Sequence, residues 1–168
     1  MSNFTIAILV KNKYGVLNRV TSMFRRRQFN ITCLNVSETE TEEYSRITVV
    51  SAGEKRTKEQ LIDQLYKLPD VVSIKELDEI SSISREVLLV KVENNSETRR
   101  DVLDAAVAFG AETVDYTKDS IVFQLTSKRN KIDEFLELLM DYNIIEICRT
   151  GVCTLERGSV NLRQAVKL

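Results

Sequence analysis

The stretch that decides the fold is FTIAILVKNKYGVLNRV, residues 4–20. Its first seven residues alternate with a period of two, and both sets of side chains are apolar or small. One set is Phe4, Ile6, Ile8 and Val10, and the other is Thr5, Ala7 and Leu9. This pattern predicts a strand that is buried on both faces. From Val16 to Phe24 the apolar residues recur at spacings of one, three and four, which predicts an amphipathic helix that ends near Gln28.

Outward from this stretch, the hydrophobic periods give the order β-α-β-β-α-β twice. Strands are expected at residues 31–37, 44–51, 71–77, 86–93, 112–116, 121–126 and 144–155. Helices are expected around residues 61–68, 102–109 and 132–139, with Pro69 and Gly110 as stops. The predicted fold class is α+β, with two tandem ferredoxin-like βαββαβ units. We expect the first domain at residues 1–79 and the second at residues 80–168, which begins in a serine-rich linker and ends in a basic tail.

Composition excludes several classes of function. The 168 residues include 24 basic and 25 acidic side chains, so a strong non-specific attraction to nucleic acid or to an anionic membrane is not expected. There is no histidine, which removes histidine nucleophile pairs, general bases and metal ligands. The three cysteines include no C-x-x-C pair, which indicates reduced thiols, no metal site and a cytoplasmic protein. Cys148 and Cys153 are expected to be small buried residues. No apolar run approaches a membrane span.

The turn between the first strand and the first helix is the leading candidate for a binding site. Backbone N–H groups at a helix N-terminus bind anions, and Gly15 lets the backbone approach a ligand closely. Asn12 offers a donor and an acceptor, which suits a zwitterion. Without a Lys-Ser/Thr pair or repeated glycines, a small carboxylate is favoured over a phosphate. The alternative is that Asn12 only shapes the turn.

Asn30 is the second candidate, because it enters the second strand directly after the helix. It does not reach the Asn12 turn of its own chain by simple adjacency, although two copies paired edge to edge would share a ligand. The alternative is that Asn30 caps the helix. RNA binding by the sheet is disfavoured, since only Phe4 and Tyr44 are aromatic on the two central strands.

The run NKYGVLNRV (residues 12–20), followed by Phe24 and Phe29-Asn30-Ile31, resembles the ACT domain of acetohydroxyacid (acetolactate) synthase small subunits. The similarity continues through SRITVV (residues 45–50), KLPDV (67–71), REVLLVKV (85–92), RTG (149–151) and LERG (155–158). The resemblance implies an N-terminal ACT domain and a C-terminal ACT-like domain. It also implies a regulatory subunit that catalyses no reaction itself. Such a subunit activates a catalytic partner and confers feedback inhibition by valine.

The family implies that thiamine diphosphate, Mg and FAD are bound only by that partner, and that ACT domains pair into a homodimer. By match, the effector site falls on Asn12, Gly15, Val16, Leu17, Asn30 and Ile31, with Asn30 supplied by the partner chain. Many members have glycine where this sequence has Gln28, so a helix that ends in the same way would give Gln28 a positive φ. A stand-alone ACT-type sensor that acts on a transcription factor or another enzyme is the alternative function. A small ferredoxin-like enzyme is disfavoured, because no tight carboxylate or Cys-Lys group is evident.

Overall fold

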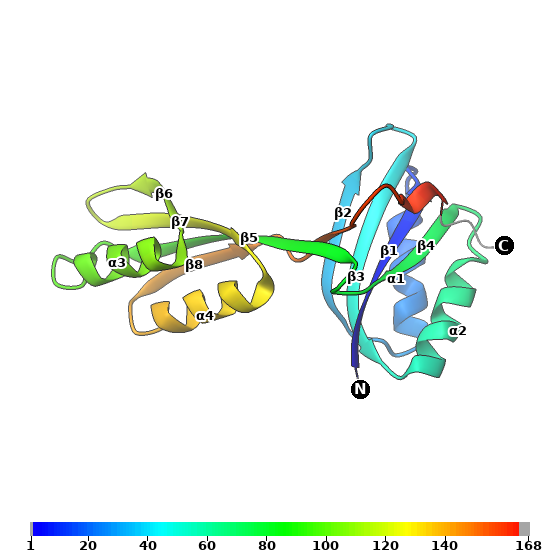
Figure 1. Cartoon of the computed structure of the whole chain (residues 1–168), viewed down its shortest axis with the longest axis horizontal. Coiled ribbons are helices and arrows are strands. Elements are labelled where there is room, and N and C mark those ends of the chain that lie inside the picture. Colours follow the sequence, from blue (N-terminus) through cyan, green and yellow to red (C-terminus); the bar gives the residue numbers. More distant parts are fainter. Residues whose placement is uncertain (1, 165–168) are drawn as a thin grey trace. The chain divides into compact units, whose positions relative to one another are not determined.

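The computed structural model describes residues 2–164, and the chain divides into two compact units. The first unit takes the residues before Arg85 together with those from Val152 onward, and the second unit is Arg85–Gly151. Each unit contains the predicted β-α-β-β-α-β order of elements (Figure 1). The predicted α+β fold class with two tandem ferredoxin-like units is therefore confirmed.

The first unit is built on a four-stranded sheet with the strand order β2-β3-β1-β4, in which all neighbours are antiparallel. Its elements are β1 (Ser2–Lys11), α1 (Val16–Arg26), β2 (Ile31–Glu38), β3 (Tyr44–Gly53), α2 (Lys55–Leu65) and β4 (Val71–Leu77). Strand β1 is central, and both Ile6 and Ala7 have an exposed fraction of 0% although they point to opposite faces. The two-sided apolar pattern of β1 thus reflects burial on both faces of the sheet.

One face of this sheet is covered by α1 and α2. The apolar side chains of β1, β3 and the two helices form one buried cluster there: Phe4, Ile6, Ile8, Val10, Val16, Val20, Phe24, Phe29, Ile47, Val49, Leu61, Leu65 and Ile74. Residues three and four apart on α1 meet this cluster, which is the reason for the helical spacing in the sequence.

The opposite face is covered by residues 152–164, which we call the C-terminal segment. It contains β9 (Cys153–Glu156) and the short helix η1 (Leu162–Gln164). Arg46 Nη2 donates to Thr154 O at 2.6 Å, and Ser73 Oγ donates to Leu162 O at 2.6 Å. Ser73 is fully buried as a result. The segment therefore supplies the second layer that a two-sided apolar strand requires.

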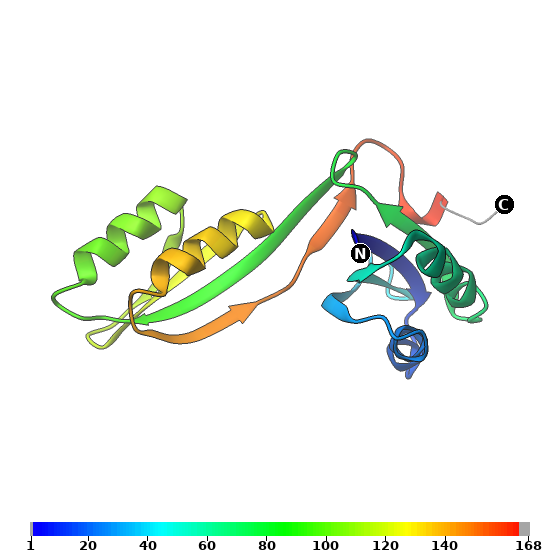
Figure 2. The same ribbon diagram turned by 90° about the horizontal axis from the view of Figure 1, so that it is seen from below.

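The second unit repeats the architecture with a sheet ordered β6-β7-β5-β8. Its elements are β5 (Ser82–Glu93), α3 (Arg99–Phe109), β6 (Glu112–Tyr116), β7 (Ser120–Ser127), α4 (Arg129–Leu139) and β8 (Ile144–Arg149). Helices α3 and α4 lie on the same face of the sheet (Figure 2). They cover a core that includes Leu88, Val90, Val92, Phe123, Ile132 and Phe135.

Three expectations differ from the structure. The domain boundary expected between residues 79 and 80 instead falls between Ser84 and Arg85, inside β5, and the C-terminal segment returns to the first unit. The single strand expected at residues 144–155 is two strands, β8 and β9, and Gly151 between them has φ 76°. Cys148 and Cys153 are exposed, so the expectation that they are buried is wrong.

The end of α1 has the hydrogen bonds that helices usually form around a glycine. Gln28 N donates to Arg25 O at 3.0 Å, and Phe29 N donates to Phe24 O at 3.0 Å. Gln28 adopts φ 58°, and the rings of Phe24 and Phe29 meet edge to face. This is a Schellman motif with its apolar contact, and Gln28 occupies the left-handed position. The helix thus ends as it would with glycine at this position, and the positive φ places backbone strain on Gln28.

Candidate functional site

The turn between β1 and α1 exposes backbone donors at a helix N-terminus. Gly15 precedes the helix with φ 77° and ψ −3°. Val16 N donates to Lys13 O at 3.3 Å, so this amide is already engaged. The amides of Leu17 and Asn18 follow in the first helical turn, where N–H groups have no intrahelical acceptor. Together with the helix dipole, they favour an anion at this turn.

Asn12 spans from this turn to the hairpin between β2 and β3. Its Nδ2 donates to Glu38 Oε1 at 3.1 Å and to Glu42 O at 3.0 Å, and its backbone N donates to Glu43 O at 2.8 Å. These bonds support the turn-shaping interpretation of Asn12. Its Oδ1 accepts no hydrogen bond from the residues that the structure describes, so this oxygen remains available to a ligand's ammonium group.

Arg19 is a charged neighbour of the turn that the sequence interpretation missed. Its Nη2 lies 2.5 Å from Asp70 Oδ2, and its Nη1 lies 3.6 Å from where a Cβ on Gly15 would stand. The spacing of four residues from Gly15 was the available signal, because it places Arg19 one helical turn above the glycine. The side chain of Arg19 is half-exposed, so its guanidinium charge can act on an anion bound at the Gly15 turn.

The structure separates the predicted residues into two groups. Asn12, Gly15, Val16 and Leu17 lie at the N-terminal end of α1, whereas residues 30–31 follow its C-terminal end. Eleven helical residues span roughly 16 Å. Within one chain the two groups therefore do not meet, as expected from the strand order.

The apolar members of the predicted site differ in exposure. Val16 is 3% exposed and belongs to the core, and Ile31 is half-buried against the same core. Leu17 is 40% exposed, and Tyr14 beside it is fully exposed. Leu17 is thus the apolar residue of the predicted site whose side chain is most accessible to a ligand.

Other classes of site find little support in the described part of the chain. The sheet face that would bind RNA in a ferredoxin-like fold is occupied in the first unit by the C-terminal segment. Within residues 2–164, cysteine, aspartate and glutamate side chains form no group of three or more that could hold a metal ion. No helix in that range has the length and apolar character that a membrane span requires.

Comparison with known proteins gives matches over both units. The model of an AHAS small subunit-like ACT domain matches residues 6–73, and the model of the small subunit of acetolactate synthase matches residues 85–158. A probable acetolactate synthase small subunit from Archaeoglobus fulgidus is 41% identical over 155 residues, which cover 92% of this chain and 97% of that protein. The acetolactate synthase small subunit of Bacillus subtilis is also 41% identical, with 92% and 90% covered.

A solved structure agrees with these matches. The crystal structure of the acetolactate synthase small subunit from Thermotoga maritima is similar, with a TM-score of 0.88 and 31% sequence identity. The match covers 95% of this chain and 100% of that chain. The resemblance seen in the sequence is therefore confirmed, and the chain belongs to the family of acetolactate synthase small subunits.

Proposed function

We propose that this chain is a non-catalytic regulatory subunit that binds and activates an acetolactate synthase catalytic subunit, and that its β1–α1 turn binds valine as a feedback inhibitor. The observation that carries the valine site is the set of groups around Gly15. The amides of Leu17 and Asn18 and the guanidinium of Arg19 suit a carboxylate, and Asn12 Oδ1 suits an ammonium group. Thiamine diphosphate, Mg and FAD belong to the catalytic partner in this proposal.

A homodimer through strand β2 would complete the site. Strand β2 is an edge of the sheet, so its outer backbone groups can pair with a second copy. A two-fold axis would pair two β2 strands antiparallel and bring Asn30 of one copy near Glu38 of the other. Glu38 already accepts from Asn12, so Asn12 and the second copy's Asn30 would face one ligand.

Two exposed apolar side chains support this pairing. Leu34 and Val36 on β2 are 37% and 41% exposed, and their register partners Val49 and Ile47 face the helices. Both side chains therefore lie at the outer rim of the core, where a second copy would cover them. A ligand bound across such an interface would favour one arrangement of the two copies, which is how an inhibitor could act on the catalytic subunit.

The test is calorimetry of the purified chain with valine, with leucine, isoleucine and alanine as comparisons. We expect saturable binding near one ligand per dimer interface. Gly15→Asp should abolish it, because a carboxylate would stand where the ligand's carboxylate binds. Gly110→Asp is the matched control, since Gly110 also has a positive φ, 68°, with open space around it in the second unit. Unchanged valine binding by Gly15→Asp would refute the site.

A second variant separates binding from folding. Asn12→Ala should weaken valine binding and cost about 1 kcal/mol of stability, because it removes exposed hydrogen bonds to the β2–β3 hairpin. If Asn12→Ala instead unfolded the chain, Asn12 would be a structural residue only. Activation is tested separately, by adding the chain to a purified catalytic subunit and measuring acetolactate formation.

A further inference from the structure

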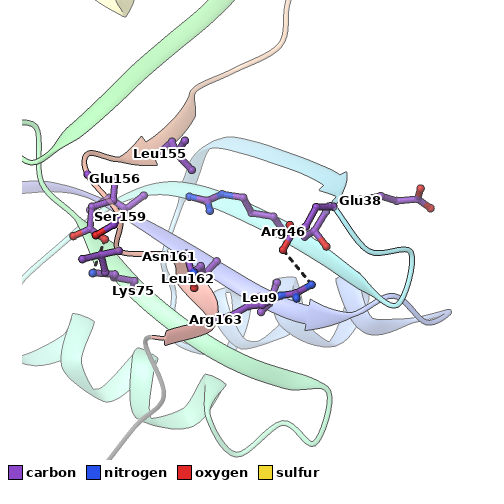
Figure 3. A pocket seen from close by; sticks show the side chains of 15 residues that line it. Leu9, Glu38, Arg46, Lys75, Leu155, Glu156, Ser159, Asn161, Leu162 and Arg163 are labelled. Carbon is purple, nitrogen blue, oxygen red and sulfur yellow. Dashed lines mark ion pairs between the residues drawn. The ribbon is translucent and has the colours of Figure 1, made fainter.

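A cavity lies on the face of the first unit's sheet that α1 and α2 do not cover, between the strands and the C-terminal segment. Its volume is about 390 Å³, which falls in the range of small-molecule sites. Its floor includes Leu9 of β1 and Arg46 of β3, and its facing wall includes Leu155 and Leu162 of the C-terminal segment (Figure 3). Leu77 of β4 also lines it. All of these residues belong to the first unit.

Most charges around this cavity are already paired. Lys75 Nζ lies 2.5 Å from Glu156 Oε2, and Arg163 Nη2 lies 3.1 Å from Glu40 Oε1. A third carboxylate, that of Glu38, accepts from Asn12 and is directed away from the other labelled side chains in Figure 3. Each of these carboxylates around the cavity therefore already has a partner.

Arg46 is the third cation that lines the cavity, and unlike Lys75 and Arg163 it has no carboxylate partner among the described residues. Its side chain is half-buried, and its guanidinium is directed toward β9 beneath Leu155 (Figure 3). Within residues 2–164 it has a carbonyl partner, Thr154 O, and no carboxylate within 4 Å. Burial lowers the pKa of Arg46, which means that its charge is poorly solvated. Five N–H donors and one protein acceptor leave donors for an anion.

We propose that this cavity binds a small aliphatic carboxylate that lacks an amino group, with its carboxylate on Arg46 and its carbon chain against Leu9, Leu77 and Leu155. A guanidinium matches a carboxylate in geometry as well as in charge. The apolar side chains of the floor and wall suit a short branched or linear chain. An amino acid is disfavoured, because its ammonium group would find each carboxylate of the cavity already engaged.

The contacts proposed for this ligand differ from those of the proposed valine site, although Glu38, which lines the cavity, accepts a hydrogen bond from Asn12. Valine is assigned to the Gly15 turn, whereas this ligand would contact the sheet face that carries Arg46 and Ser73. Because the C-terminal segment forms one wall, the ligand would also hold that segment on the sheet. Binding should therefore protect the backbone amides of β9 from hydrogen exchange.

The experiment is a heteronuclear NMR titration of the full chain with 3-methylbutanoate. The uncharged 3-methylbutan-1-ol and valine serve as comparisons. We expect saturable shifts from residues that line the cavity, with a dissociation constant in the millimolar range, and no saturable shifts there with the alcohol. Arg46→Gln should weaken binding at least about tenfold, since it removes the charge and keeps a donor for Thr154 O. Gly15→Asp should leave 3-methylbutanoate binding unchanged while it abolishes valine binding.

A second variant covers the case in which Arg46→Gln does not fold. Leu155→Trp should fill the cavity and block binding, and the side chain of Leu155 is 62% exposed, so the fold should tolerate the change. The proposal is refuted if 3-methylbutanoate causes no saturable shifts at the cavity, or if the alcohol binds equally well. Binding that survives both Arg46→Gln and Leu155→Trp would refute it as well.

Discussion

Replacing Gln28 by glycine tests whether the end of α1 is strained, as its backbone angle indicates. A left-handed backbone costs an L-residue about 1–2 kcal/mol, and glycine avoids this cost. Glycine also loses more chain entropy on folding, which offsets roughly 0.5–1 kcal/mol. The midpoints of these two ranges differ by about 0.75 kcal/mol, which is the stabilisation of the first unit expected for Gln28→Gly. With a urea slope of about 1.5 kcal/mol/M, the midpoint should rise by about 0.5 M.

The matched control uses the second unit. Gly110 has φ 68°, Gly110 N donates to Val107 O at 3.0 Å, and Ala111 N donates to Ala106 O at 2.8 Å. These are the bonds that surround Gln28 at the end of α1, and a side chain on Gly110 would meet open space. Gly110→Gln should therefore destabilise the second unit by a similar amount. Urea unfolding followed by NMR signals from each unit measures both changes, since one global probe would mix the two units.

One outcome contradicts this reasoning directly. If Gln28→Gly left the midpoint of the first unit unchanged or lowered it, with the same urea slope, the positive φ of Gln28 would not be a source of strain. A fall in the slope would instead mean that the denatured or native state had changed in compactness.

Three further predictions concern packing, a buried ion pair and a capped turn. Gly53→Ala should destabilise the first unit by about 1–3 kcal/mol in urea unfolding, because the new methyl group would overlap the ring of Phe29. Arg149→Met should cost about 3 kcal/mol in the same assay, because it leaves the buried carboxylate of Glu86 unpaired, whereas the double variant with Glu86→Gln should recover part of the loss. Hydrogen bonds from the Ser81 hydroxyl and from the backbone amides of Ser81 and Ile80 lower the pKa of Asp78. Asp78→Asn should therefore reduce stability above about pH 5, and its difference from the unsubstituted chain should disappear as the pH falls through the lowered pKa.

The parts of the fold that depend on local pattern were predictable from the sequence. The change from a period of two to helical spacing at Gly15 locates β1 and α1, because each period records which side chains face the core. The positive φ of Gln28 was expected from the family resemblance, because many members have glycine at this position. The turn residues Asn12 and Gly15 lie where their spacing placed them.

The remaining features depend on contacts between distant residues. The pair of Arg19 and Asp70 is separated by 51 residues, and neither has a local pattern that indicates its partner. Arg149 donates to Glu86 across 63 residues, and the local sequence around neither residue indicates that Glu86 is 3% exposed. Such pairs follow from strand order and register, and the periodicity of one segment does not contain that information.

The C-terminal segment shows why the domain boundary differed from expectation. Strand β1 is apolar on both faces, so its sequence required two covering layers, and α1 with α2 supplies only one. The sequence contained no third amphipathic element near the first unit that could serve as the second layer. Residues 152–164 supply it from the far end of the chain, anchored by Ser73, Arg46 and Lys75. A two-sided apolar strand in a domain with helices for only one face therefore indicates a missing layer, and in this chain residues 152–164 provide it.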